Sequence, residues 1–254
     1  MERMAKTVCV LGADTGVGKT TLTAILLAQA REAGMEALAL KPFSSGGRED
    51  AITLMGGRSN PSELDRINPW HYRLPLAPLI AAQIDGEPMP DLVETLDWIQ
   101  SSRKDRDLVL IEGAGGLLTP IAMSFTMLDV ARELGSKLVV VVRNRLGAIN
   151  QTRLCYEVLV ARLKDSGSFV LSGEEFPDRS AEDNLRLIQE FCPGWKSFEL
   201  PWVAQANERL EMWAVKKCFE KLLAQILEPD RNINVLCDAN QKANLREAAG
   251  LSPK

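Results

Sequence analysis

A lysine and two threonines follow a glycine-rich turn near the start of the chain, and these residue types together are suited to binding phosphate. Residues 12–21 read Gly-Ala-Asp-Thr-Gly-Val-Gly-Lys-Thr-Thr. Such a turn points backbone N–H groups at a phosphate, and the positive end of the following helix adds to the attraction. The ammonium of Lys19 would reach the β- and γ-phosphates, and the hydroxyl of Thr20 would bind Mg²⁺. We therefore expect a nucleoside triphosphate to bind at this turn.

The segments around this turn are those that a phosphate-binding loop needs. An apolar run over residues 7–11 predicts a strand before it, and residues 22–30 predict a helix after it. The strict pattern G-x-x-x-x-G-K-[ST] has glycine at the position of Ala13, whereas this chain has glycine one residue earlier, at Gly12. Two interpretations follow from the residues alone: a loop that is one residue longer, or an ordinary glycine-rich turn.

Apolar runs alternate with helical patterns along the chain, which predicts a mostly parallel sheet with helices on both faces. Residues 138–142, Leu-Val-Val-Val-Val, are apolar throughout, as expected for a central strand covered on both sides. The predicted fold class is therefore α/β, a three-layer domain of the P-loop NTPase type. We expect further strands at 36–40, 108–111 and 168–171, and helices at 91–101, 127–134, 151–164, 181–190 and 207–227.

Length and composition set limits on the class of protein. The chain has 254 residues, of which 46% are hydrophobic, so it can bury the core of one large domain. We predict one domain over residues 1–228 and a polar, partly disordered extension over 229–254. The formal net charge of −4 gives no field that would attract nucleic acid or an anionic membrane.

Cysteine spacing and hydropathy indicate the compartment. The five cysteines are scattered without C-x-x-C spacing, which favours neither a zinc site nor a disulfide framework. No apolar run approaches the length of a membrane span, and the first residues lack the apolar stretch of a signal peptide. The sequence therefore predicts a soluble protein of the reducing cytoplasm.

Ligands of such sheets gather at the carboxyl ends of the strands, so residues that directly follow strands carry most weight. Lys41 follows the second predicted strand and begins the run Lys-Pro-Phe-Ser-Ser-Gly-Gly. A second ammonium there would neutralise charge on a transferring phosphoryl group or hold an anionic substrate. The alternative is a solvated lysine that leads into a turn.

Two acidic residues are candidates for completing a Mg²⁺ site with Thr20, because Mg²⁺ is usually held by one or two carboxylates together with phosphate oxygens and water. Glu112 ends the apolar run at 108–111, and Asp50 lies near a predicted helix start. Asp50 has a second interpretation as a helix cap. Gly115 and Gly116 after Glu112 allow a ligand to approach the backbone closely, although they also fit a plain tight turn.

Other polar residues give weaker signals. His71 is the only histidine, and without a cysteine or serine partner pattern it argues against a hydrolytic triad. Arg143 and Arg145 follow the fourth predicted strand. Arginines at a strand end could bind a carboxylate or phosphate, or could simply be solvated or in ion pairs, and the sequence favours neither interpretation.

Taken together, these motifs resemble the dethiobiotin synthetases, the ATP-dependent carboxylases and cyclases of biotin synthesis. The family's phosphate loop has the same early glycine as Gly12. The resemblance extends from about residue 7 to about residue 202, and the motifs that carry it lie at residues 12–20, 41–46, 50–51, 67–69, 75–78, 112–116, 119–120, 146–150 and 200–202.

The resemblance implies a reaction of 7,8-diaminopelargonate with CO₂ or bicarbonate and ATP, with Mg²⁺ as the metal. It implies that Lys19 and Lys41 stabilise negative charge, that Thr15 and Ser45 hydrogen-bond near a carbamate, and that Thr20, Asp50 and Glu112 hold Mg²⁺. It also implies a homodimer, in which the segment matching 146–150 comes from the partner subunit and receives the substrate carboxylate. The implied nucleotide contacts are Asp14, Thr15, Gly16, Val17, Gly18, Lys19, Thr20, Thr21, Glu112, Gly115, Gly116 and Ser172, and the implied substrate contacts are Ser45, Leu146, Gly147, Ala148, Ile149 and Asn150.

The chain departs from the family pattern at several positions. Leu79 and Gln151 stand where relatives often have histidine, and the loop between Ser45 and Asp50 is short. Ser172 stands where relatives have an asparagine that reads the adenine ring. A hydroxyl cannot supply the paired donor and acceptor of an amide, so we expect looser recognition of the base.

Two other functions fit the same phosphate loop. One is a related enzyme that amidates or carboxylates another acid; such enzymes usually need a glutamine-hydrolysing domain with a nucleophilic cysteine, and none of the cysteines here has a nucleophile-elbow setting. A nucleotide switch of the partition-ATPase type typically has a second lysine inside the loop, where this chain has Asp14 and Thr15.

Overall fold

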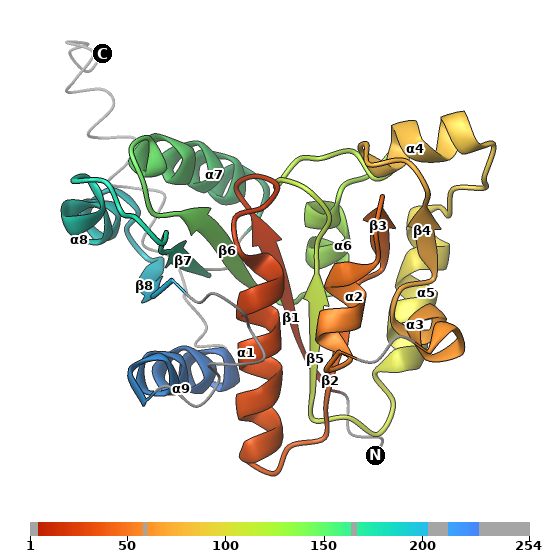
Figure 1. Ribbon diagram of the computed structural model, residues 1–254, viewed down its shortest axis with the longest axis horizontal. Helices are drawn as coiled ribbons and strands as arrows, with labels where there is room; N and C mark the ends of the chain where they lie inside the picture. Colours follow the sequence, from red (N-terminus) through yellow and green to blue (C-terminus); the bar gives the residue numbers. More distant parts are fainter. Residues whose placement is uncertain (1–4, 58–59, 164–166, 203–212, 229–254) are drawn as a thin grey trace, which may run out of the picture.

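The computed structural model, shown in Figure 1, describes residues 5–57, 60–163, 167–202 and 213–228. Its main feature is a 6-stranded sheet in the order β2-β5-β1-β6-β7-β8, in which all neighbouring strands are parallel. The predicted fold class is therefore confirmed. The strands are β2 (Ala37–Leu40), β5 (Leu108–Glu112), β1 (Lys6–Gly12), β6 (Lys137–Arg143), β7 (Ser168–Ser172) and β8 (Lys196–Leu200).

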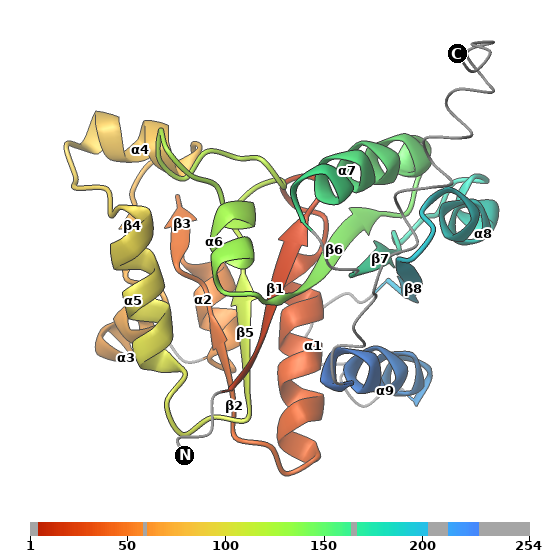
Figure 2. The same cartoon turned by 180° about the vertical axis from the view of Figure 1, so that it is seen from behind.

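Helices cover both faces of the sheet, as Figures 1 and 2 show from opposite sides. On one face lie α1 (Lys19–Glu32) and α9 (Trp213–Leu227). On the other lie α5 (Leu92–Ser102), α6 (Met127–Glu133) and α7 (Ala148–Arg162), with α8 (Ala181–Phe191) beside α7. Beyond the β2 edge lie the short helices α2 (Glu49–Leu54), α3 (Pro61–Ile67) and α4 (Pro78–Asp85).

The core lies between the central strands and these helices. Leu138 to Val142 of β6 are all buried, and so are all five residues of β5. A strand covered on both faces has no solvated side, which explains why its sequence is apolar throughout instead of alternating. The same burial means that a charged residue at the end of β5, Glu112, must find its partners inside the protein.

A second, two-stranded parallel sheet supports the chain that follows β2. It pairs β3 (Phe43–Ser45) with β4 (Trp70–Tyr72). The rings of Phe43 and Trp70 stack with centroids 5.0 Å apart, and Trp98 of α5 meets Trp70 edge-on at 5.4 Å. Such aromatic contacts fix the positions of their backbones. Lys41, two residues before Phe43, is thereby held against the main sheet.

The elements differ from the sequence-based expectations at several places. Helix α7 begins at Ala148, earlier than the predicted start at residue 151, because Gly147 takes a left-handed conformation with φ 95° directly before it. The strands β3, β4 and β8 and the helices α3 and α4 were not predicted. The predicted helix 207–227 is observed from Trp213 to Leu227, while residues 207–212 and the predicted extension 229–254 lie outside the described residues. Within the described ranges, no helix is long and apolar enough to cross a membrane.

Candidate active site

The loop between β1 and α1 contains several positions that favour glycine. A Cβ on Gly12 would lie 2.8 Å from the carbonyl oxygen of Asp14 and 2.9 Å from Nζ of Lys19. Gly16 and Gly18 have φ values of 70° and 97°, in the left-handed region. The early glycine is therefore required by close packing, which favours the interpretation of a longer phosphate-binding loop over an ordinary turn.

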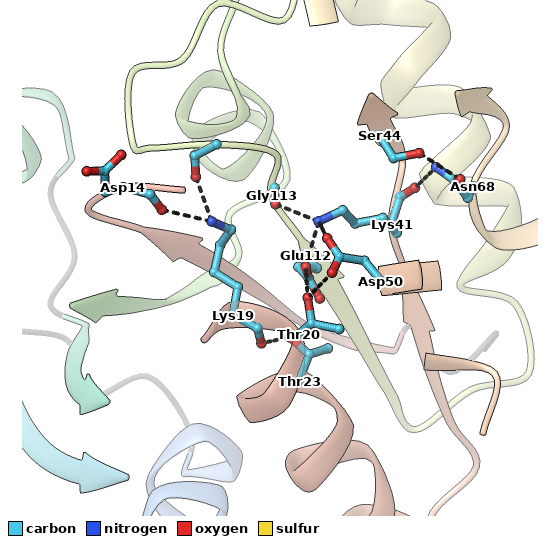
Figure 3. Close-up of polar contacts among 11 residues, drawn as sticks. Asp14, Lys19, Thr20, Thr23, Lys41, Ser44, Asp50, Asn68, Glu112 and Gly113 are labelled. Carbon is cyan, nitrogen blue, oxygen red and sulfur yellow. Dashed lines mark hydrogen bonds and ion pairs between the residues drawn. The ribbon is translucent and has the colours of Figure 1, made fainter. Parts of the chain in front are cut away.

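Lys19 connects this loop to the one that follows β5. Its Nζ donates to the carbonyl oxygens of Asp14 at 3.0 Å and Gly115 at 2.8 Å, as the left part of Figure 3 shows. Burial disfavours the charged form of its ammonium, and the nearby charge of Lys41 adds to this effect. Together they lower the pKa of Lys19 to about 8. The Lys19 amine is thus only partly protonated in mildly alkaline solution. An anion bound beside it would favour the charged form and raise the pKa of Lys19.

We expect binding of a nucleoside triphosphate to take up protons between about pH 7.5 and 9.5, because the anion favours the charged form of Lys19. Below this range the ammonium is already charged before binding, so uptake by this group should fall toward zero. Calorimetry in buffers of different ionisation enthalpy measures the uptake. In Lys19→Arg the uptake should disappear, since a guanidinium stays charged across this range. Uptake that persists in this variant would assign the proton to another group.

A cluster of four side chains lies where α1, α2, β2 and β5 meet (Figure 3). Nζ of Lys41 donates to Asp50 Oδ2 at 2.8 Å, to Glu112 Oε1 at 2.6 Å and to the carbonyl oxygen of Gly113 at 3.3 Å. The hydroxyl oxygen of Thr20 lies 2.8 Å from Asp50 Oδ1 and 2.7 Å from Glu112 Oε1. The structure therefore brings together Thr20, Lys41, Asp50 and Glu112, four residues that the sequence placed in a common site.

The charges of this cluster stabilise one another. Burial alone would disfavour the charged ammonium of Lys41, but Glu112 and Asp50 outweigh it and raise its pKa above the ordinary value. Burial likewise opposes the carboxylate of Asp50, but the Lys41 charge and its hydrogen bond lower the pKa of Asp50. Lys41 therefore remains a cation in neutral solution, and its alternative interpretation as a solvated lysine is wrong because only 3% of the residue is exposed.

The residues around Thr20 fit a magnesium ion. Oε2 of Glu112 is buried and has no hydrogen-bond partner among the described residues, so this oxygen is available to bind a metal ion. Together with Asp50 and the hydroxyl of Thr20 it forms a set of hard oxygen donors, which Mg²⁺ prefers. The described part of the chain holds no group of three or more His, Cys, Asp or Glu that could bind a metal. Two carboxylates are sufficient for Mg²⁺, because phosphate and water supply its other ligands.

Asn68 belongs to the motif at residues 67–69 that supported the family resemblance, but the sequence analysis gave it no role in the site. It is fully buried, and its side-chain amide donates to the carbonyl oxygen of Lys41 at 2.7 Å. Its Oδ1 accepts from Oγ of Ser44 at 2.9 Å and from Nε of Arg48 at 3.0 Å. These contacts fix the backbone that carries Lys41 and Ser45. The motif at residues 67–69 marked this position, but its residue types alone do not reveal the role, because one asparagine before a proline is common in turns.

The remaining residues of the predicted site lie in the phosphate loop or in the segments that follow β2 and β5. Thr15 is exposed and its N–H donates to Asp14 Oδ1 at 2.7 Å, and Thr21 lies half-buried in the first turn of α1. Oγ of Ser45 is buried and has no hydrogen-bond partner within the described residues. Gly116 lies against the loop, since a Cβ there would lie 3.2 Å from the carbonyl oxygen of Ala13.

The segment 146–150 does not join the Lys41 cluster of the same chain. It follows β6, whereas Lys41 follows β2 and Glu112 ends β5, on the other side of β1 in the sheet. Leu146 is 81% exposed, and Ala148 to Asn150 form the first turn of α7. Of the arginines nearby, Arg143 contacts the carbonyl oxygen of Gly16 and lies 3.7 Å from Glu174. His71 contacts the carbonyl oxygen of Gly46 at 2.7 Å, which agrees with an ordinary packed histidine.

Ser172 ends β7 directly beside the phosphate loop. Its Oγ would lie 2.7 Å from a Cβ placed on Gly18. A cavity of about 390 Å³ is lined by residues of β7 and β8 and of the start of α8, among them Leu171, Leu200 and Ala181, but not by Ser172. This volume lies in the range of small-molecule sites. It lies at the carboxyl ends of β7 and β8, the edge of such a sheet at which ligands bind.

The loop geometry and the order of the parallel strands define a nucleoside-triphosphate-binding protein of the P-loop class. The profile of the family described as an AAA domain matches residues 6–208. An ATP-dependent dethiobiotin synthetase from Methanocaldococcus jannaschii is 39% identical over 158 residues, which cover 59% of this chain and 72% of the relative. Its counterpart from Mycobacterium marinum is 38% identical over 73% of this chain and 83% of its own length. The chain belongs to the dethiobiotin synthetase family.

Solved structures of other P-loop ATPases share the fold. A ParA family ATPase from Chlorobium tepidum aligns with a TM-score of 0.55 and 14% identity, over 88% of this chain and 98% of that one. The cell division protein MinD from Aquifex aeolicus aligns with a TM-score of 0.58 and 15% identity, over 89% of this chain and 99% of its own. At such low identity these similarities concern the fold alone.

Proposed function

We propose that the protein is an ATP-dependent dethiobiotin synthetase, which converts 7,8-diaminopelargonate and CO₂ to dethiobiotin with the formation of ADP and phosphate. The observation that carries this proposal is the buried ion pair between Lys41 and Glu112, 2.6 Å apart and in contact with Thr20 of the phosphate loop. Lys41 is a second fixed cation beside the phosphate loop, in addition to Lys19. Such a cation suits a phosphoryl acceptor that itself carries a negative charge. Membership of the dethiobiotin synthetase family supports the same substrate.

The reaction proceeds in three steps that need no covalent bond to the enzyme. One amine of the substrate attacks CO₂, forms a C–N bond and loses a proton, which gives a carbamate. A carbamate oxygen then attacks the γ-phosphorus of ATP, and the bond from that phosphorus to ADP breaks. The second amine attacks the carbonyl carbon of the resulting carbamic-phosphoric anhydride, loses a proton and expels phosphate, which closes the cyclic urea.

The residues of the site contribute electrostatic stabilisation and positioning. Lys19 and Lys41 offset the negative charge that gathers where the carbamate and the γ-phosphoryl group meet. The hydroxyls of Thr15 and Ser45 hydrogen-bond near the carbamate, and the buried, unpartnered Oγ of Ser45 supports this assignment. Thr20, Asp50 and Glu112 would hold Mg²⁺, which supplies positive charge to the phosphates when bound.

The substrate carboxylate binds at Leu146 to Asn150 of the partner subunit in a homodimer. Two observations support this arrangement: the segment lies away from the Lys41 cluster of its own chain, and the side chain of Leu146 is largely exposed. The N–H groups at the start of α7 and the positive end of its dipole suit a carboxylate. A cytoplasmic location is supported by the free, buried cysteines Cys9, Cys155 and Cys192.

The alternative of a nucleotide switch rests on the fold shared with ParA and MinD ATPases. Fold similarity alone does not assign a function, because one fold supports many activities. The synthetase is favoured by its curated relatives and by Asp14 and Thr15 in the phosphate loop. A switch would hydrolyse ATP slowly without a diamine.

The origin of the ring carbon tests the proposal directly. With ¹³C-bicarbonate, 7,8-diaminopelargonate, ATP and Mg²⁺, mass spectrometry should detect dethiobiotin that carries one ¹³C atom. Omission of the diamine should remove both the labelled product and the release of phosphate. If the protein binds ATP but forms no labelled product, it is instead a related enzyme that acts on another acid or amine.

Loose recognition of the nucleotide base is a further expectation for this enzyme. Sites that hydrogen-bond a specific group reject analogues by about 10⁴ to 10⁵-fold, whereas Ser172 offers a single hydroxyl. We expect kcat/KM values for ATP, GTP and CTP to agree within about tenfold. Ser172→Asn should widen the preference for ATP. A wild-type preference for ATP above about 10³-fold would show that residues other than Ser172 recognise the base.

A further inference from the structure

Arg48 joins the start of α2 to the turn that follows α3. It is the residue directly before α2, two positions before Asp50 of the proposed Mg²⁺ site. Nε of Arg48 donates to Oδ1 of Asn68 at 3.0 Å, and its Nη2 donates to the carbonyl oxygen of Asn68 at 2.7 Å. Its Nη1 donates to Oδ1 of Asp65 at 2.8 Å. The rigid guanidinium therefore holds Asn68 by both its side chain and its backbone.

Asn68 in turn holds the backbone of Lys41, as the right part of Figure 3 shows. Its side-chain amide donates to the carbonyl oxygen of Lys41 at 2.7 Å. The N–H of Lys41 donates to the carbonyl oxygen of the neighbouring Ile67 at 2.8 Å. Both polar groups of the Lys41 backbone are thus bonded to the turn after α3. Arg48 consequently links the helix that carries Asp50 to the backbone that carries Lys41.

The loop between β3 and α2 does not fix the position of α2 by itself. Residues 46 and 47 are both glycine, and Gly46 has a φ of 81°. Glycine adopts many backbone conformations, so this loop allows α2 to approach in more than one way. Helix α2 has only 6 residues, too few to be stable without contacts to its neighbours. The side chain of Arg48, which is only 19% exposed, supplies such a contact.

The relative position of Lys41 and Asp50 matters because these side chains contact each other and the proposed metal site. Nζ of Lys41 lies 2.8 Å from Oδ2 of Asp50, and Oδ1 of Asp50 lies 2.8 Å from the hydroxyl oxygen of Thr20. A shift of α2 away from Lys41 would withdraw one carboxylate from the oxygen donors that fit Mg²⁺. Outer partners that orient a metal ligand typically contribute about 10 to 100-fold to metal affinity or activity.

We propose that Arg48 is a positioning residue, which fixes Asp50 relative to Lys41 through its two hydrogen bonds to Asn68. The part of this inference that concerns the rate of phosphoryl transfer rests on the proposed function. The part that concerns metal affinity rests only on the oxygen donors around Thr20. Lysine would not replace Arg48, because an ammonium lacks the fixed fork of donors of a guanidinium.

The test compares the full-length wild type with Arg48→Ala and Arg48→Lys, and the matched control is Arg66→Ala, which removes an exposed arginine from the last turn of α3. Electron paramagnetic resonance measures the affinity for Mn²⁺, as the probe for Mg²⁺, with a non-hydrolysable ATP analogue present. We expect the dissociation constant for Mn²⁺ to rise about tenfold or more in both Arg48 variants and to stay unchanged in the control. The affinity for the analogue without metal should not change, because the phosphate loop is intact.

The direction of the change in Mn²⁺ affinity separates positioning from charge. Removal of a positive charge would by itself favour a bound cation, so an effect of charge alone would tighten Mn²⁺ binding in Arg48→Ala. Displacement of Asp50 weakens this binding instead. Arg48→Lys keeps the charge, so weaker binding in both variants assigns the effect to the hydrogen bonds. Single-turnover phosphate release with the diamine should fall about 10²-fold in both variants, since small displacements of reacting groups have effects of this size.

The outcomes separate this inference from the proposed function. Wild-type affinity for Mn²⁺ in a folded Arg48→Ala protein, or full recovery of that affinity in Arg48→Lys, would overturn the role of Arg48. An equal loss of affinity for the metal-free analogue would also overturn it, because it would indicate a general disturbance of the fold. A wild-type protein that binds Mn²⁺ and the analogue but releases no phosphate with the diamine would overturn the proposed function, but not the role of Arg48 in metal binding.

Discussion

Replacement of Lys41 by alanine should lower the rate of diamine-dependent phosphate release by about 10² to 10³-fold, the usual cost of losing one fixed group that stabilises developing charge. The ammonium is 2.8 Å from Asp50 and 2.6 Å from Glu112, and its pKa is raised, so it is a fixed cation throughout the pH range of an assay. Single-turnover measurements with ATP and Mg²⁺ isolate the phosphoryl-transfer step from product release.

The control for this variant is Lys104→Ala, which removes an exposed lysine outside the site and should leave the rate unchanged. The Lys41→Ala protein should also be shown to be folded and to bind ATP, because loss of Lys41 leaves Glu112 buried without its ion-pair partner. A folded, ATP-binding Lys41→Ala protein with more than about a tenth of the wild-type rate would contradict the assigned role.

The two carboxylates of the cluster should differ in their contribution to stability. Glu112 has no exposed surface, and Glu112→Gln replaces the buried charge that pairs with Lys41, so we expect the free energy of unfolding to fall by roughly 3 kcal/mol. The side chain of Asp50 is 50% exposed, and Asp50→Asn should cost about 1 kcal/mol or less because water screens its charge. Both variants should lose activity, since both remove an oxygen donor from the proposed Mg²⁺ site.

Urea unfolding of the two variants, followed by circular dichroism, measures this difference. Each substitution changes a carboxylate to an amide of nearly the same shape, so each variant is the control for the other. Equal losses in the two variants, or a larger loss in Asp50→Asn, would show that burial of Glu112 does not dominate the stability of the cluster.

The parts of the site that the sequence predicted are those in which local pattern and topology agree. A glycine-rich turn between an apolar strand and a helix is recognisable from the residues alone. The rule that ligands gather at the carboxyl ends of parallel strands then brings Lys41 and Glu112 to the same edge, although 71 positions separate them. The structure agrees, because β2, which ends directly before Lys41, and β5, which ends at Glu112, are neighbours in the sheet.

The parts that the sequence did not predict depend on contacts that form only in the folded chain. Asn68 is a single polar residue whose role comes from Lys41, 27 positions away, and the buried Asn184 likewise donates to Asn144, 40 positions away. The strands β3 and β4 have 3 residues each, too few to show an alternating pattern. The phosphate loop was ambiguous in sequence because the reason for Gly12 is the close approach of Asp14 and Lys19, which only the structure reveals.

The measurement that tests the central claim most directly is phosphate release by the wild-type enzyme with ATP, Mg²⁺ and bicarbonate, in the presence and absence of 7,8-diaminopelargonate. A synthetase should release phosphate only when the diamine is present, with one phosphate for each molecule of dethiobiotin formed. Equal phosphate release in both conditions would indicate a nucleotide switch or an ATPase that hydrolyses ATP without the diamine. No release in either condition, from an enzyme that binds ATP, would show that the acceptor is a different molecule.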